Sequence, residues 1–276
     1  MIGMLRFTLL ESLRQGTLLF YLAVSTIILL LLLLGIRLDD SNPNQLTLFG
    51  MPFFQKMASV NVVEMLLVML QKQATFWLIL FGIIASAGLI PSLLEKGTAE
   101  LFLSKPQSRT TIYLSRSLGA VTGVAVNIAY FIVGVWLVVG LKLGVWQSGL
   151  LLAIIAISFA FACFYSVIGL VALISRNGLI AVMLAFLYTL VSSGLETRAH
   201  GLYRLWDNAI YHRTLDVLYY LLPQFDSMLS HTSLLIGRSP FGTGPAEFSI
   251  LPFVYSGLSA TLLYAAGCYY FQRQDY

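Results

Sequence analysis

The sequence has few charged residues. Only 10% of its 276 residues are Asp, Glu, Lys or Arg, whereas 58% are hydrophobic, and the mean hydropathy is +0.86. A soluble domain carries roughly a quarter charged residues, so this deficit indicates that lipid is the main solvent of the folded chain. The 16 basic residues exceed the 12 acidic ones but form no run. Contact with anionic lipid therefore explains them better than binding of nucleic acid.

Cysteine and histidine are also scarce. Cys163 and Cys268 both lie inside apolar runs, which excludes a disulfide framework and a cysteine-rich metal site and makes them packing residues. The histidines, His200, His212 and His231, are 12 and 19 residues apart, much farther than the i and i+4 pairs of many metal sites. We therefore predict no metal and no cofactor, and we expect all three histidines to be solvated or interfacial.

Motifs for catalysis and nucleotide binding are missing. The sequence has no Gly-x-Ser-x-Gly elbow and no phosphate-binding loop that ends in Gly-Lys-Ser or Gly-Lys-Thr. No carboxylate falls near the centre of an expected span, so proton-relay chemistry has no obvious carrier. The sequence predicts neither catalytic residues nor a nucleotide site, and the chain is not expected to be an enzyme.

Long apolar runs are abundant. A bilayer-spanning helix needs about 20 apolar residues, and six runs meet that length. The apolar stretch at 60–70 is too short to cross alone, and it contains Asn61 and Glu64. The second span is therefore placed at 74–94, either by itself or as the lower part of one longer helix. We predict an all-α integral membrane protein with one domain, residues 1–276. Its six spans are placed at 17–36, 74–94, 112–141, 149–174, 179–195 and 251–271.

Two further segments have an amphipathic helical pattern. Residues 2–15 place apolar side chains at helical spacing between polar ones, which is typical of a helix that lies in the membrane surface. The outer loop, 196–250, contains a segment at 202–221 that is rich in tyrosine and tryptophan, the residues that settle at headgroup level. We predict one or two interfacial helices there, ended by Pro223.

Six spans place both termini on one side of the membrane. The basic residues divide evenly between the two sides, but those on the side of the termini lie in shorter segments. Because long loops count for less in the positive-inside rule, the pattern favours cytoplasmic termini.

A few residues inside the expected spans have structural roles. Gly119 and Gly123 form a small-xxx-small pair that permits close helix approach. Asn127 is predicted to hydrogen-bond across helices, since an unpaired amide in hydrocarbon is costly. Pro91 is expected to kink the second span and so to set the direction of the loop that follows.

The loop after the second span is charged and interrupted by proline. Glu100 lies near the start of a brief predicted helix, where the helix dipole favours an anion, and Pro106 ends it. The apolar side of this helix consists of Ala99, Leu101, Phe102 and Leu103. A small protruding element of mixed charge suits a docking site for a soluble partner. The alternative is an amphipathic helix that only lies on lipid.

Four short motifs follow one another in this loop: Glu95-Lys96-Gly97-Thr98, Glu100-Leu101, Ser104-Lys105-Pro106 and Ser108-Arg109. They resemble the cytoplasmic loop between spans two and three of ABC-2 type transporter permeases. The tail Phe271-Gln272-Arg273-Gln274-Asp275 is similar to the way many of those subunits end. The overall plan looks most like the permeases associated with nitrous-oxide reductase maturation and bacterial gliding.

The resemblance implies a function for the whole chain. It implies that 2–15 is an elbow helix and that 95–109 is a coupling helix seated in a cytoplasmic ABC ATPase subunit. The implied ATPase-coupling residues are Glu95, Lys96, Gly97, Thr98, Glu100, Phe102, Lys105, Pro106 and Arg109. It also implies pairing with a second permease subunit, identical or not, in the bacterial cytoplasmic (inner) membrane.

The expected function is therefore the permease subunit of an ABC exporter, with ATP hydrolysis in a separate subunit. Two alternatives stay open. One is an ABC-coupled subunit that transmits force to extracytoplasmic envelope proteins, with the outer loop as the platform. The other is a membrane-embedded enzyme such as a lipid transferase. Besides these partners we expect contact with membrane lipids.

Overall fold

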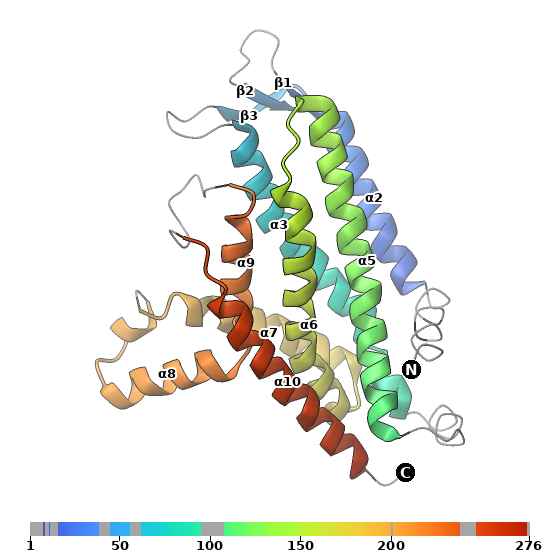
Figure 1. Cartoon of the computed structure of the whole chain (residues 1–276), viewed down its shortest axis with the longest axis vertical. Helices are drawn as coiled ribbons and strands as arrows, with labels where there is room; N and C mark the ends of the chain where they lie inside the picture. The colour runs from blue at the N-terminus through green and yellow to red at the C-terminus, as the bar shows by residue number, and fades with distance from the viewer. Residues whose placement is uncertain are drawn as a thin grey trace.

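The computed structural model of the chain is a bundle of long helices (Figure 1). It describes Thr8, Glu11 and residues 16–38, 45–55, 62–94, 108–199, 201–237 and 247–274. Six of its helices are long and apolar enough to cross a membrane, so the predicted fold class, an all-helical multi-pass membrane protein, is confirmed. The six are α2 (Thr17–Gly35), α3 (Val62–Ser86), α5 (Arg109–Leu143), α6 (Gly149–Ser175), α7 (Gly178–Glu196) and α10 (Leu251–Gln272).

The second span differs most from its predicted bounds. α3 begins at Val62, and after a turn at 87–90 the chain continues as a short 3-10 helix, η1 (Pro91–Leu94). The described part of this apolar stretch, 62–70, is thus the first part of one long helix. The sequence placed the span at 74–94 with one longer helix as the alternative, and the structure has the longer helix, which continues through the polar residues Gln71 and Lys72. They are good helix formers, and Gln71 is buried within the bundle.

Side-chain and glycine caps define the helix ends. Ser108 precedes α5 and accepts a hydrogen bond from the Thr111 backbone N–H, and Asn177 caps α7 in the same way. Gly144 ends α5 in a left-handed conformation with φ of 70°. Because caps satisfy backbone groups that the helix leaves unpaired, these residues fix where the turns between spans begin.

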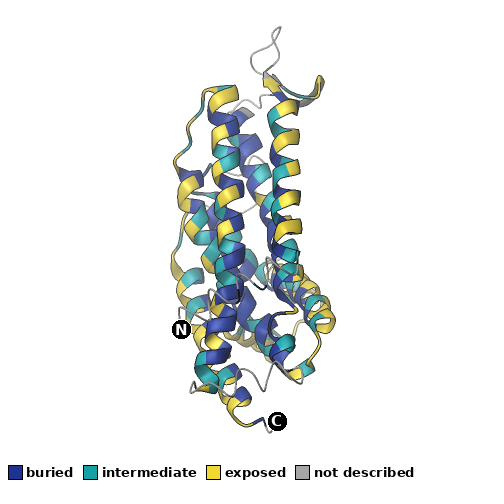
Figure 2. Ribbon diagram, turned by 90° about the vertical axis from the view of Figure 1, so that its right-hand side faces the viewer, coloured by how far each residue is buried: buried dark blue, intermediate teal, exposed yellow. Residues whose placement is uncertain are grey.

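The core is centred on α6, which packs against α5, α7, α10 and α9 (Phe225–Ser233). Ile157, Phe161 and Phe164 of α6 are fully buried. Apolar side chains on the outer faces of the other spans are exposed instead (Figure 2), for example Leu34 of α2 and Leu262 of α10. In a membrane these outer faces contact hydrocarbon, which is why they are apolar without being packed.

A small antiparallel sheet, which the sequence analysis did not predict, lies at the end of α2. Its strands are β1 (Ile36–Leu38), β2 (Gln45–Leu48) and β3 (Met51–Gln55), in the order β1-β2-β3. The two-residue turn Phe49-Gly50 has positive φ at both positions, the geometry that matches the twist of a tight hairpin. The sheet is short, so it does not change the helical class.

The outer loop contains both exposed and buried helices. A 3-10 turn, η2 (Leu202–Arg204), and α8 (Ala209–Leu221) occupy the segment predicted to be helical, and α8 has no buried residue. The next helix, α9, was not predicted. It packs against α3, α6 and α7, with Phe225 and Met228 buried (Figure 1). The chain therefore returns into the bundle between the fifth and sixth spans.

Candidate functional site

The candidate site is the end of the bundle where α2 begins and α10 ends, called here the termini side. Of the predicted ATPase-coupling residues, the structure describes only Arg109. The others lie outside the described residues: Glu95, Lys96, Gly97, Thr98, Glu100, Phe102, Lys105 and Pro106. Of the predicted elbow helix, 2–15, only Thr8 and Glu11 are described. The structure does describe both roots of the segment 95–107, namely η1 before it and Ser108–Arg109 after it.

The first root is held by a buried arginine. The Arg116 side chain on α5 is only 1% exposed and forms a two-pronged ion pair with Glu11. Its Nη1 donates to Glu11 Oε2 and its Nη2 donates to Glu11 Oε1 at 3.0 Å. The same Nη2 donates to Ser92 Oγ in η1, also at 3.0 Å. Because hydrogen bonds of a guanidinium to a carboxylate are strong and directional, three separate segments meet at one fixed point.

The second root is tied to the end of the last helix. Arg109 Nη1 donates to the backbone oxygens of Gln272, at 3.2 Å, and Gln274, at 2.5 Å. A cation placed on the last carbonyls of a helix also interacts favourably with the helix dipole. The start of α5 and the end of α10 are thereby joined, and Ser108, the cap of α5, is next to the joint.

Closely packed residues lie beneath the two roots. Tyr113 of α5 is fully buried, and the centre of its ring is 6.3 Å from that of Phe271 in α10. A Cβ at Gly267 would lie 2.5 Å from the Tyr113 hydroxyl oxygen, so α10 can approach this closely only because it has glycine there. The tight packing beneath the two roots therefore restricts independent movement of α5 and α10.

The three predicted packing residues of α5 have different surroundings. A Cβ at Gly119 would lie 2.7 Å from the Thr8 side chain, and Gly123 borders a small cavity beside Leu18 of α2. Asn127 is buried, but its amide oxygen and nitrogen have no hydrogen-bond partner among the described residues. The predicted hydrogen bond across helices is thus absent from the described part of the chain, whereas a close approach occurs at Gly119.

The histidines occupy different environments. His212 stacks on Tyr203 with ring centres 4.3 Å apart, whereas His200 lies outside the described residues. His231 is buried on α9, with Nδ1 2.8 Å from the Ser227 carbonyl oxygen, so the expectation that it is solvated or interfacial was wrong. Within the described ranges, no group of three or more His, Cys, Asp or Glu residues could hold a metal ion.

The Glu11–Arg116 pair was the main feature that the sequence interpretation missed. The helical pattern of 2–15 places Glu11 among the polar residues of a surface helix, and Arg116 lies near the start of the predicted third span. An arginine two turns inside a spanning helix requires a partner, since an unpaired charge in hydrocarbon is costly. Arg116 thus predicts an acidic partner from its position in the sequence alone. Which of the carboxylates pairs with it follows only from the fold.

No model of a known protein family matches the chain, and a search of curated proteins finds no similar sequence. The motifs of the 95–109 segment and the geometry of its roots are therefore the features that bear on function.

Proposed function

We propose that this chain is the membrane-spanning permease subunit of an ABC transporter, an exporter driven by a separate cytoplasmic ATPase subunit. The observation that supports the proposal best is the attachment of both roots of the 95–107 segment. Ser92, before it, is bonded to Arg116 and through it to Glu11, and Arg109, after it, is bonded to the end of α10. The motifs of the segment itself resemble the coupling loop of ABC-2 type permeases.

The attachments give the segment a mechanical role. A partner that pushes on 95–107 displaces Ser92 and Arg109, and their bonds pass the displacement to the N-terminal segment, to α5 and to α10 together. ATP shifts such an equilibrium because it binds one state of the ATPase pair more tightly than the other. In this scheme two copies of the six-helix bundle, or two related bundles, rock relative to each other.

The first test asks whether an ATPase binds at this segment. A photo-cross-linking residue in place of Ser104 is expected to capture a cytoplasmic ATPase subunit in intact cells. Purification in mild detergent is expected to retain the same subunit, with measurable ATP hydrolysis. Capture of phospholipid alone, or purification without ATPase activity, contradicts the proposal.

The second test uses matched variants. Replacing Glu100 and Arg109 by alanine is expected to lower the ATPase activity that co-purifies by about tenfold, since interface contacts of this kind contribute about 1.4 kcal/mol or more. Arg176→Ala is the control, because Arg176 is exposed in the turn between α6 and α7 on the same side. Equal loss in both variants, or no loss in the first, contradicts a specific coupling role for 95–109.

A second candidate function is transmission of force to an envelope machine, favoured by the character of α8 and the turn before it. Leu205, Trp206 and Ile210 are 76%, 67% and 75% exposed, which makes a protruding apolar surface. Such patches mark contacts with other proteins or with membrane. Deletion of 205–221 is expected to abolish association with extracytoplasmic proteins if this function applies. Retained association after the deletion argues against it.

A further inference from the structure

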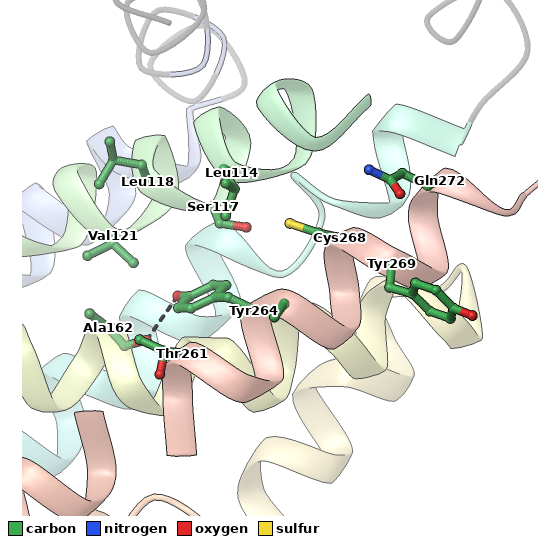
Figure 3. A pocket seen from close by; sticks show the side chains of 11 residues that line it. Leu114, Ser117, Leu118, Val121, Ala162, Thr261, Tyr264, Cys268, Tyr269 and Gln272 are labelled. Atoms are coloured by element: carbon green, nitrogen blue, oxygen red, sulfur yellow. Dashed lines mark hydrogen bonds between the residues drawn. The ribbon is translucent and has the colours of Figure 1, made fainter. Parts of the chain in front are cut away.

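A groove runs between α5 and α10 in the half of the bundle nearest the termini side (Figure 3). Its volume is about 720 Å³, within the range of roughly 300–1,000 Å³ that is typical of small-molecule sites. Leu114, Leu118 and Val121 form one wall, and Tyr264 and Cys268 belong to the other. Ala162 of α6 also lines the groove, and its carbonyl oxygen accepts a hydrogen bond of 2.9 Å from the Tyr264 hydroxyl.

The groove opens towards the membrane. Leu118 and Tyr269, on opposite walls, are 41% and 56% exposed, and both belong to helices that cross the membrane. An apolar groove that opens to the outer face of membrane-spanning helices suits a hydrocarbon chain as its occupant. Its few polar lining residues include Gln272, which lies at the end of α10, where the head of such a molecule would be.

Positive charge gathers at that end. The Arg109 guanidinium is 3.2 Å from the Gln272 backbone oxygen, and the guanidinium carbon of Arg273 is 4.4 Å from the ring centre of Tyr269. Arg273 is exposed and forms no ion pair with another described residue. No carboxylate is among the side chains that line the groove in the described part of the chain. The mouth of the groove thus complements an anionic head group.

We infer that this groove binds one anionic phospholipid from the leaflet on the termini side. An acyl chain lies between α5 and α10, and the phosphate lies at Arg273. A second copy of the chain is the competing occupant. A two-fold contact through this face would bring Arg109 and Arg273 of both copies together, and like charges oppose such a contact. The inference requires only that the two helices span the membrane, and it does not depend on the proposed function.

Native mass spectrometry tests the inference with matched variants. The protein is reconstituted in vesicles of equal phosphatidylethanolamine and phosphatidylglycerol, and lipids that remain bound are identified by mass. The wild-type chain is expected to retain one phosphatidylglycerol. Ala265→Phe, which places a ring in the groove from an exposed position, is expected to lose it. Ala266→Phe, at the next residue of α10, which is also exposed but does not line the groove, is expected to retain it.

The head-group contact is tested separately. Arg273→Gln is expected to reduce the preference for phosphatidylglycerol about fivefold, as removal of one basic residue near a membrane surface predicts. Arg176→Gln, a cation on the same side away from the groove, is expected to leave the preference unchanged.

Three results overturn the inference. The first is lipid retention by Ala265→Phe equal to that of the wild type. The second is equal retention of both lipids by the wild type. The third is conversion of a dimer to a monomer by Ala265→Phe with the lipid count unchanged, which assigns the groove to a second copy.

Discussion

At the scale of single residues, Arg116 shows how a charge is accommodated inside a membrane helix. It is the largest of the fully buried side chains in the described ranges, yet it lies two turns into α5. Glu11 neutralises it, and Ser92 accepts a further hydrogen bond. A buried ion pair contributes little net stability, but removal of one partner leaves an uncompensated charge.

We predict that Glu11→Gln destabilises the protein by about 3 kcal/mol, because the buried guanidinium of Arg116 then loses the negative charge of Glu11. The measurement is thermal unfolding in detergent, followed by circular dichroism. The double variant Glu11→Gln with Arg116→Met is expected to lose clearly less than the sum of the two single variants. Simple additivity of the three measurements would show that the two side chains are not coupled.

Gly149, the first residue of α6, allows a backbone contact that no larger residue permits. A Cβ there would lie 1.7 Å from the Leu235 carbonyl oxygen, and a backbone oxygen cannot move aside as a flexible side chain can. Gly149→Ala is therefore expected to cost about 1–3 kcal/mol in the same unfolding assay. Gly88→Ala is the control, since a Cβ there has no neighbour within 4 Å. Comparable stability of the two variants would refute the contact.

At the scale of elements, α9 shows why a buried helix escaped prediction. Its sequence, Phe225–Ser233, is largely polar, which is typical of an exposed loop. In the structure the polar groups bond to the helix's own backbone: Thr232 Oγ1 donates to the Met228 carbonyl at 2.7 Å. Such bonds satisfy the hydroxyl groups within the helix itself. The sequence therefore carries no pattern that would indicate burial of this polar helix.

Side-chain hydroxyls from the spans fix the position of α9. Ser256 accepts a hydrogen bond from the Gln224 backbone N–H at 2.8 Å, and Ser192 accepts one from the Asp226 N–H at 3.2 Å. Ser256 belongs to α10 and Ser192 to α7. They satisfy the donors that a helix leaves unpaired at its start, which explains how α9 begins inside the bundle.

For α8 we predict a position in the membrane surface. Val217 and Leu221 are 63% and 59% exposed on one apolar side of the helix, whereas His212 and Asp216 lie on the other side. A nitroxide at position 217 is expected to collide mainly with oxygen, which concentrates in the bilayer, and one at position 212 mainly with a water-soluble nickel complex. The spectra are recorded in vesicles by electron paramagnetic resonance. Equal collision rates at both positions would place α8 in water.

The attachment of α8 is expected to depend on pH. Asp216 Oδ1 accepts hydrogen bonds from the Tyr203 hydroxyl at 2.6 Å and from Arg198 Nε at 2.8 Å. The Tyr203 hydroxyl, followed by Arg198, lowers the pKa of Asp216 below its ordinary value. A carboxyl with a lowered pKa stabilises the fold above its unfolded pKa of about 3.9, and this contribution is lost as the pH falls through the folded pKa.

We therefore predict that α8 is held at pH 6 and loosens below about pH 4, with a change under about 1 kcal/mol because the pair is partly exposed. A nitroxide at Thr214 reports the mobility of the helix at both pH values. Asp216→Asn is expected to give the mobile spectrum at both. Identical spectra of this variant and the parent at pH 6 would mean that Asp216 does not hold α8.

At the scale of the whole molecule, the lengths of the apolar runs predicted the bounds of most spans. Polar residues within one run obscured where that span begins. Five spans begin and end within three residues of their predicted bounds, because each needs an apolar run long enough to cross a hydrocarbon core about 30 Å thick. The start of the second span stayed open between two alternatives, because Gln71 and Lys72 interrupt its apolar run. The Glu11–Arg116 contact joins residues 105 positions apart, and pairing at that range depends on the fold.

The arrangement of the spans predicts opposite sides for two turns. Lys142 lies at the end of α5 and Arg176 in the turn after α6, which returns across the membrane. In a variant without Cys163 and Cys268, a cysteine at position 142 is expected to react with an impermeant maleimide in intact cells. A cysteine at position 176 is expected to react only after permeabilisation. Labelling of both in intact cells would contradict this topology.

The length of α5 has a mechanical consequence. Its 35 residues contain no proline and make a continuous rod about 52 Å long, well beyond the thickness of the hydrocarbon core. One end carries the joint with α10, and the other contacts β1. A tilt of about 5° around the first end swings the far end by about 4.5 Å over that length. A small stroke at one face of the bilayer thus becomes a displacement of several ångströms at the opposite face.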